Sequence, residues 1–193
     1  MDINFQNNKR QSKLHLAVLE QDKNKVEYLI KNGINIYLQD DLGRMALHYI
    51  VYCEINFIKY ILNIYPNINF PDYEGNSILH LMSKHYLTDD LLKYMVDKRV
   101  NINLRNYYGQ SPIMLCRDYR LMVRYGANIN NQDSNGDTLL HYSIYNDIDI
   151  ELLLDLGADV RIVNNNNLNP LQMNSERMMR EYSCYCFKNM TIN

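Results

Sequence analysis

A short phrase containing leucine and histidine returns along the chain at nearly regular intervals. It reads LHLA at 14–17, ALHY at 46–49, ILHL at 78–81 and LLHY at 139–142, with weaker copies around 114 and 172. Successive histidine positions lie 33, 32, 34, 27 and 31 residues apart. A repeat of this length predicts a solenoid, in which each unit is one supersecondary structure that packs against its neighbours.

A turn signal precedes each copy of the phrase. An Asp or Asn stands three residues before a position that is usually glycine, and a Ser or Thr often follows. Asp and Asn accept hydrogen bonds from nearby backbone amides, and glycine tolerates a positive φ angle, so the pair predicts a tight turn. The hydroxyl residue stands where a helix N-cap is favoured. The residues are Asn7, Asp40, Asp72, Asn106, Asp133 and Asn164; Gly43, Gly75, Gly109 and Gly136; and Ser12, Ser77, Ser111 and Thr138.

Each turn is followed by apolar residues at helical spacing, which predicts two short helices per unit. We expect a first helix over 46–52 in the second unit and a second helix near 149–156 in the fifth. Glycine favours the left-handed conformation that commonly ends a helix. Gly33, Gly126 and Gly157 are predicted to end second helices in this way, and Pro66 and Val100 replace that turn in two other units.

These marks together resemble the ankyrin repeat family, which has a period near 33 and a T-P-L-H-x-A phrase. The resemblance covers essentially the whole chain and implies an all-α solenoid of about six helix-turn-helix units joined by extended, β-hairpin-like loops. It departs from the family phrase at Arg10, Met45, Ile78, Met114, Asn167 and Gln172. The expected units of this single domain are 7–39, 40–71, 72–105, 106–132, 133–163 and a C-terminal cap at 164–193.

Two consequences follow for packing. The fourth unit is about six residues short, so its first helix should be clipped. One unit cannot bury its apolar face without a neighbour, so Leu47, Leu79 and Leu140 are predicted to lie in a core shared between units.

Composition limits the classes of partner. The net formal charge is −2 and the sequence pI is near 6.2, which argues against nucleic acid, since nucleic-acid binding calls for a basic face. The most apolar region, 45–65, is interrupted by polar residues, and the N-terminus lacks a secretory apolar segment, so we expect no membrane span and no secretion. Without a secretory signal, the four cysteines are expected to be free thiols.

No residue pattern predicts catalysis, a cofactor, a metal site or a small-molecule substrate. Four of the five histidines occupy the same repeat position, and the resemblance implies that each bonds near the next loop as a structural residue: His15, His48, His80 and His141. His85 stands outside the phrase, with contact and solvated polar roles both open. The pair Cys184 and Cys186 lacks the second pair that a structural zinc site needs.

A binding surface is expected at the positions that vary between units. In the resembled family, partners bind the turns between units and the first helices, and Tyr and Arg are favoured at interface hot spots. Because tyrosine is abundant in this chain, with 17 residues, some exposed tyrosines are also expected without a partner. The expected contact residues are Arg44, Tyr52, Tyr73, Glu74, Asn76, His85, Arg105, Tyr107, Tyr108 and Gln110.

The irregular spacing and the abundance of Asn, Ile, Tyr and Lys resemble ankyrin proteins of large DNA viruses, poxviruses especially. That resemblance implies an intracellular module that binds a host protein and modulates host defence or host range, in the host cytoplasm, with the nucleus left open. About 20 residues follow the last phrase, so we expect no F-box-like segment, which favours a direct blocker over a degradation adaptor. The alternative is an assembly scaffold that binds cognate proteins and has no host target.

Overall fold

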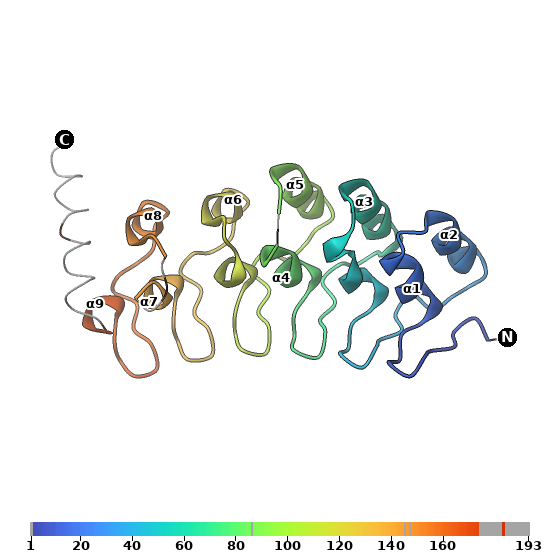
Figure 1. Cartoon of the computed structure of the whole chain (residues 1–193). Helices are drawn as coiled ribbons and strands as arrows, with labels where there is room; N and C mark the ends of the chain where they lie inside the picture. Colours follow the sequence, from blue (N-terminus) through green and yellow to red (C-terminus); the bar gives the residue numbers. More distant parts are fainter. Residues whose placement is uncertain (1, 86, 145, 147, 174–182, 184–193) are drawn as a thin grey trace.

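The computed structural model describes residues 2–85, 87–144, 146, 148–173 and 183. These residues form a row of helix pairs, each pair joined to the next by a long loop (Figure 1). Within the described ranges an isolated bridge between Gln6 and Ser12 is the only β pairing, so the all-α prediction is confirmed. The pairs are α1 (Lys13–Leu19) with α2 (Lys23–Lys31), η1 (Ala46–Tyr52) with α3 (Ile55–Ile64), α4 (Ile78–Ser83) with α5 (Asp89–Asp97), η2 (Pro112–Leu115) with α6 (Tyr119–Arg124), and α7 (Leu139–Tyr142) with α8 (Ile150–Asp155), followed by α9 (Pro170–Met173).

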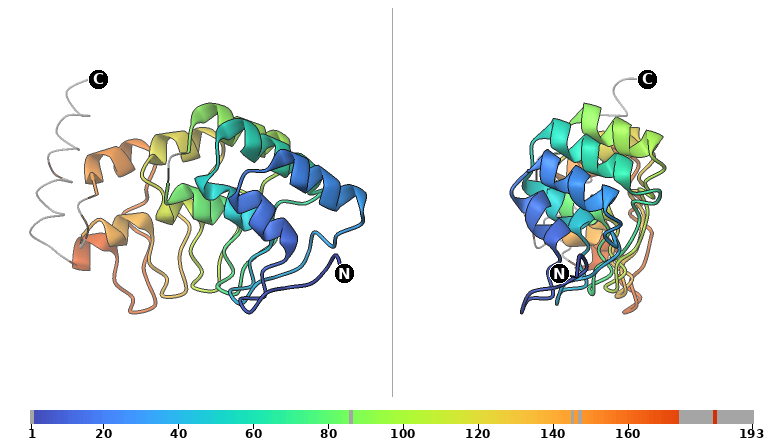
Figure 2. Two further views of the ribbon diagram at one scale, coloured as in Figure 1. Left: turned by 45° about the vertical axis from the view of Figure 1, so that its right-hand side comes forward. Right: turned by 90° about the vertical axis from the view of Figure 1, so that its right-hand side faces the viewer.

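The helices form two layers. The second helices α2, α3, α5, α6 and α8 form one row, and the first helices form another row beneath it, nearer the loops (Figure 1). All the loops extend to the same side of the molecule, as the turned views show (Figure 2). This arrangement gives the chain two long edges: one made by the loops, and one made by the short turns that join each first helix to its second helix.

Local sequence explains where the helices begin. The first helices start after Ser12, Met45, Ser77, Ser111 and Thr138, so the four predicted hydroxyl N-caps are confirmed and Met45 takes the fifth place. Second helices use the common Asp or Thr cap, in which the side chain accepts a hydrogen bond from a first-turn backbone N–H. Asp22 accepts from Lys25, and Asp149 accepts from Leu152.

The core runs without interruption between the two layers. Leu47, Leu79 and Leu140 are all buried, with exposed fractions of 1% or less, as the repeat predicts. Each belongs to one continuous apolar cluster that includes residues of both helix rows. Neighbouring units therefore supply each other's missing apolar wall, which is how a solenoid obtains its stability.

The ends of the second helices differ in part from the prediction. Gly33, Gly126 and Gly157 have φ angles of 78°, 92° and 90°, as expected. In the third unit the left-handed residue is Arg99, with φ of 60°, and not Val100, which is buried. The prediction for Val100 was wrong because the spacing there was aligned one residue too late.

The fourth unit is shortened at its helices. η2 spans 4 residues, and α6 spans 6 where α5 spans 9. The turn and loop of this unit keep their length, so the missing residues come from the edge where η2 meets α6. None of the helices among the described residues is long and apolar enough to cross a membrane.

Candidate functional site

The turn before each first helix has one geometry throughout the described chain, and we call these turns the tips. In the third tip, Asp72 Oδ1 accepts backbone hydrogen bonds from Glu74 and Asn76, both at 2.9 Å, and Gly75 has a φ of 81°. Arg10 and Asn167 replace glycine in the first and last tips and take the same left-handed conformation, with φ of 56° and 58°. The Asp or Asn residues that organise the tips in this way are Asn7, Asp40, Asp72, Asn106, Asp133 and Asn164.

Backbone hydrogen bonds connect each tip to the next. The N–H of Tyr73 donates to the carbonyl of Leu42 at 2.9 Å, and the N–H of Tyr107 donates to the carbonyl of Glu74 at 3.0 Å. The remaining bonds run from Asp41 to Lys9, from Ser134 to Tyr108 and from Asn165 to Asn135, at 2.9–3.2 Å. Because main-chain bonds fix neighbouring tips to one another, their side chains are held as one row, which we call the tip row.

Large side chains are concentrated in the middle of the tip row. Leu42, Tyr73, Tyr107 and Tyr108 have exposed fractions of 55%, 54%, 72% and 57%, although they are hydrophobic or aromatic. The first tip instead exposes Asn8 and Lys9, and the fifth exposes Ser134 and Asn135. An apolar and aromatic centre with polar ends is the arrangement found at protein interfaces.

Glycine at the tips lets the tyrosine of the next tip approach closely. A Cβ atom built on Gly43 would lie 2.1 Å from Cδ1 of Tyr73. A Cβ atom on Gly75 would lie 2.6 Å from the backbone nitrogen of Tyr107 and 2.9 Å from its Cδ1. The rings of Tyr73 and Tyr107 therefore rest against the preceding glycine, which limits their freedom and leaves the rest of each ring exposed.

The repeated histidines connect the first helices to the following loops. In the third unit, the backbone N–H of Ser77 donates to His80 Nδ1 at 3.1 Å, so the ring proton lies on Nε2, which donates to the carbonyl of Gln110 at 3.0 Å. His15, His48 and His141 make the equivalent contacts to the carbonyls of Arg44, Phe70 and Leu168. Burial lowers the pKa of His15, His48 and His80, so the neutral ring is favoured. These four histidines are structural, as expected.

The structure divides the predicted contact residues into exposed and supporting ones. Tyr52, Tyr73, Glu74, His85, Arg105, Tyr107 and Tyr108 are exposed. Arg44 is half-buried, and its Nε lies 3.5 Å from Oδ2 of buried Asp72, an ion pair between the second and third units. Gln110 is also half-buried, and its carbonyl accepts from both His80 and the backbone N–H of Asn106. Arg44 and Gln110 therefore mainly support the tips.

The prediction that Asn76 offers its side chain to a partner was wrong. Asn76 is buried, with an exposed fraction of 2%, beneath the third tip. Its Nδ2 donates to Glu74 Oε2 at 2.9 Å, and its Oδ1 accepts from Asn106 Nδ2 at 2.9 Å. The position after the tip glycine points inward here, so Asn76 joins two units instead of facing outward.

Other supporting residues were missed from the sequence. Gln39 Nε2 donates to the carbonyl of Gly43 at 2.9 Å, Gln132 Nε2 donates to that of Gly136 at 2.7 Å, and Arg105 Nε donates to that of Gly109 at 2.9 Å. The signal was present, since each of these long donors directly precedes the Asp or Asn of its tip. Arg105 is therefore both exposed and fixed by the turn beneath it.

Two predicted contact residues lie away from the tip row. Tyr52 follows the first helix of the second unit, and His85 follows α4, so both lie at the turn edge, one helix length from the tips. Their rings meet edge to face with centroids 5.1 Å apart, and the exposed fraction of Tyr52 is 75%. The predicted contact residues thus form two groups at opposite ends of the first helices.

The described residues contain no group of three or more His, Cys, Asp or Glu side chains placed to hold a metal ion. Cys53 and Cys116 are free thiols, and burial raises the pKa of both, that of Cys53 to about 11. The Cys184 and Cys186 pair lies outside the described residues.

Comparison with known proteins gives the same repeat. The family model for three copies of the ankyrin repeat matches residues 1–72, and the single-repeat model matches residues 135–165. An ankyrin repeat protein of Acanthamoeba polyphaga mimivirus is 28% identical over 156 residues, which is 77% of this chain and 20% of the mimivirus protein. This chain therefore spans about a fifth of that relative's length.

Two further relatives differ in kind. An ankyrin repeat protein of fowlpox virus is 28% identical over 186 residues, covering 90% of this chain and 97% of the fowlpox protein. The NF-kappa-B inhibitor alpha of Rattus norvegicus is 32% identical over 92 residues, which is 43% of this chain and 29% of the rat protein. Together with the two matched family models, these similarities show that the chain belongs to the ankyrin repeat family.

Proposed function

We propose that this chain is a viral ankyrin protein that binds a host protein through its tip row and so modulates host defence or host range. Ankyrin repeats build protein-interaction modules, and the chain is such a module. The identity of the partner as a host protein, and the location of the complex in the host cytoplasm, belong to the proposal.

The centre of the tip row carries this proposal. Tyr73, Tyr107 and Tyr108 are exposed on turns that the backbone bonds hold in place, with Leu42 beside them and polar tips at either end. Tyrosine supplies a large contact area with little side-chain entropy to lose, and a rigid backbone reduces the loss further. A hot spot of aromatic residues surrounded by polar ones fits recognition of a folded protein surface.

The relatives support a host target. Four of the six similar proteins belong to mimivirus or fowlpox virus, and the other two are vertebrate inhibitors of NF-kappa-B. A virus gains from binding host proteins that a host ankyrin protein also binds, so we place a host signalling protein first among the partner classes. A direct block of such a protein needs no further activity from the chain.

The proposal can be tested by affinity capture from cultured vertebrate cells. An epitope-tagged chain is compared with a Tyr107→Ala/Tyr108→Ala variant and with a Tyr28→Ala control, and the captured proteins are quantified by mass spectrometry. Tyr28 is a suitable control because its exposed fraction is 65% and it lies on α2, in the other helix row. We expect host proteins that are captured by the intact chain and the control but depleted with the double variant.

Two results would count against the proposal. Recovery of only this chain or other viral proteins would favour an assembly scaffold. Recovery of the same host proteins with the double variant, at unchanged amounts, would remove the tip row from the interface.

A further inference from the structure

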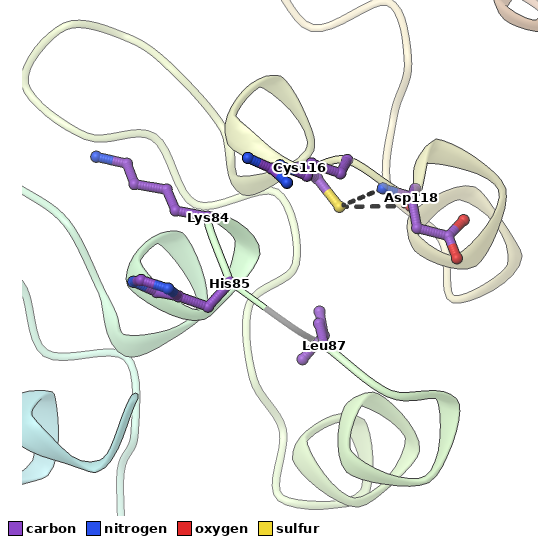
Figure 3. Close-up of a pocket in the computed structure, with 6 residues that line it drawn as sticks. Lys84, His85, Leu87, Cys116 and Asp118 are labelled. Atoms are coloured by element: carbon purple, nitrogen blue, oxygen red, sulfur yellow. Dashed lines mark hydrogen bonds between the residues drawn. The ribbon is translucent and has the colours of Figure 1, made fainter. Parts of the chain in front are cut away.

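A groove opens at the turn edge between the third and fourth units, far from the tips. It has a volume of about 390 Å³ and is lined by Lys84, His85, Leu87, Cys116, Arg117 and Asp118. Figure 3 shows these side chains arising from the end of α4, the start of the chain leading to α5, and the turn between η2 and α6. No function has been attached to this groove above.

The shortened fourth unit explains why the groove is there. α4 ends at Ser83, whereas η2 beside it spans only Pro112–Leu115, and α6 starts four residues later. The shorter helix stops before it reaches the end of its neighbour, so Lys84 and His85 have no first-helix residues packed against them on that side. A full-length unit would fill this space.

The floor of the groove is apolar. Leu87 is half-buried and packs against the core, and Cys116 is buried within it. The thiol of Cys116 lies 3.3 Å from the backbone nitrogen of Asp118 and 3.4 Å from its carbonyl oxygen, bonds that close the turn. Since burial also raises the pKa of this thiol, Cys116 serves as floor and as a turn brace.

The walls of the groove are mainly cationic. Lys84 and Arg117 are exposed, and among the described residues neither forms an ion pair within 4 Å. The carboxylate of Asp118 already accepts a hydrogen bond from the backbone N–H of Leu121 as the cap of α6. It also lies at the end of the lining opposite Lys84 (Figure 3). This local positive charge contrasts with the chain's net charge of −2.

We propose that this groove binds an acidic peptide segment that carries one large apolar side chain. The apolar side chain lies over Leu87 and Cys116, and its flanking carboxylates pair with Lys84 and Arg117. The exposed Tyr52 ring, which contacts His85, extends the surface toward the second unit. The assignment rests on the proposed protein-binding function, to which it adds a second contact region of defined chemistry.

The test is a selection from a library of random 12-residue peptides on the purified full chain. The strongest peptide is then labelled, and its affinity is measured by fluorescence anisotropy. We expect selected peptides to combine several Asp or Glu residues with one large apolar residue. Binding should weaken about tenfold in Lys84→Glu/Arg117→Glu and by a smaller factor in Lys84→Gln/Arg117→Gln. It should also weaken as salt is raised, because exposed charges are screened.

The matched control is Lys31→Glu/Lys93→Glu, which makes the same change of charge at two exposed lysines of the second-helix row. Unchanged affinity is expected there and in Tyr107→Ala/Tyr108→Ala, with thermal unfolding showing that each variant is folded. The proposal is overturned if no peptide is selected, if selected peptides lack acidic residues, or if both groove variants bind as the intact chain does. Self-association that depends on Lys84 and Arg117 would instead place a second copy in the groove.

The two proposals can fail separately. If the groove variants capture the same host proteins in the same amounts while the tip variant loses them, the groove assignment falls and the tip row stands. If the groove binds acidic peptides but the tip variant loses no host protein, the reverse holds.

Discussion

Asn106 donates a hydrogen bond from Nδ2 to Oδ1 of Asn76 across 2.9 Å, between two side chains that are both buried. The bond connects the third unit to the fourth directly beneath the tips that carry Tyr73 and Tyr107. Each amide is also fixed within its own tip, since Asn76 Nδ2 bonds Glu74 and Asn106 Oδ1 accepts from two backbone amides. The relative position of the two tyrosines therefore depends on this amide pair.

Replacing Asn76 with alanine should destabilise the fold. Asn106 Nδ2 would keep only the contact to Gln110 Oε1 at 3.5 Å, and leaving a buried donor poorly paired costs about 1–3 kcal/mol. The measurement is the free energy of unfolding in urea. Asn8→Ala, at an exposed position of the first tip, is the control and should change stability little. Equal stability of the two variants would mean that the amide pair contributes nothing.

Truncation of the repeated leucine should be costly in every unit. Leu47→Ala, Leu79→Ala and Leu140→Ala each remove a fully buried side chain, so we expect about 2–5 kcal/mol of destabilisation. Leu42→Ala, at an exposed tip, should lie within about 0.5 kcal/mol of the intact chain. Urea midpoints that do not move in the three core variants would contradict the packing described here.

Two glycines with nearly the same φ angle should respond differently to alanine. In Gly33→Ala the new Cβ meets no atom within 4 Å, so only the left-handed backbone is penalised, by about 1–2 kcal/mol. In Gly75→Ala the Cβ would also displace the backbone of Tyr107 and weaken its bond to Glu74. We expect Gly75→Ala to be the more destabilising by about 1 kcal/mol or more. Comparable unfolding free energies would show that the tips can separate freely.

The tip tyrosines should contribute to binding and not to folding. Once a partner has been captured, Tyr107→Ala and Tyr108→Ala should each weaken its affinity by more than about 1 kcal/mol, as is typical of hot-spot residues. Both side chains are exposed, so the thermal midpoint should stay near that of the intact chain. Titration calorimetry gives the affinity, and Tyr28→Ala provides the comparison. A parallel loss of folding in the double variant would make these residues structural.

The buried histidines should make stability fall as the solution becomes acidic. Burial lowers the pKa of His15, His48 and His80 in the folded chain below the value of about 6.5 found in unfolded chains. Near pH 7.5 these rings are neutral in both states. Below about pH 6.5 the unfolded chain binds protons that the folded chain does not, so the free energy of unfolding decreases by at most about 1.4 kcal/mol per pH unit for each histidine.

Urea unfolding at pH 7.5, 6.5 and 5.5 measures this dependence. His80→Gln keeps a side-chain donor near Gln110 but removes one titrating group, so its stability should vary less steeply with pH. An identical pH dependence in the variant would show that His80 does not contribute.

The repeat phrase predicted much of the fold because one physical need recurs in every unit. The buried leucine, the neutral histidine and the Asp-to-glycine turn each fill the same structural place several times, so agreement between copies identified them. The predicted helix over 46–52 matches η1, and the expected helix near 149–156 contains α8 with its caps. Recurrence did not specify the conformation, since η1 is a 3-10 helix.

The contact surface was less predictable, because variable positions have no second copy for comparison. Asn76 follows a tip glycine, as Arg44 and Gln110 do, yet its side chain turns fully inward to meet Asn106, a pairing that depends on both residues. The groove at Cys116 and Arg117 was missed for another reason. Its signal was the interval of 27 residues, which predicted a clipped helix but not the space left beside α4.

The bonds between tips also determine where the length of this chain can change. Each tip donates one backbone N–H backward and offers one carbonyl forward, so a whole unit could be inserted or removed and every amide would still find its partner. A partial deletion has no such freedom at the loop edge. In the fourth unit the lost residues come from η2 and α6, and Tyr107 and Ser134 still make their bonds. One edge of the molecule therefore keeps the period, and the other accommodates insertions and deletions at which new surfaces can arise.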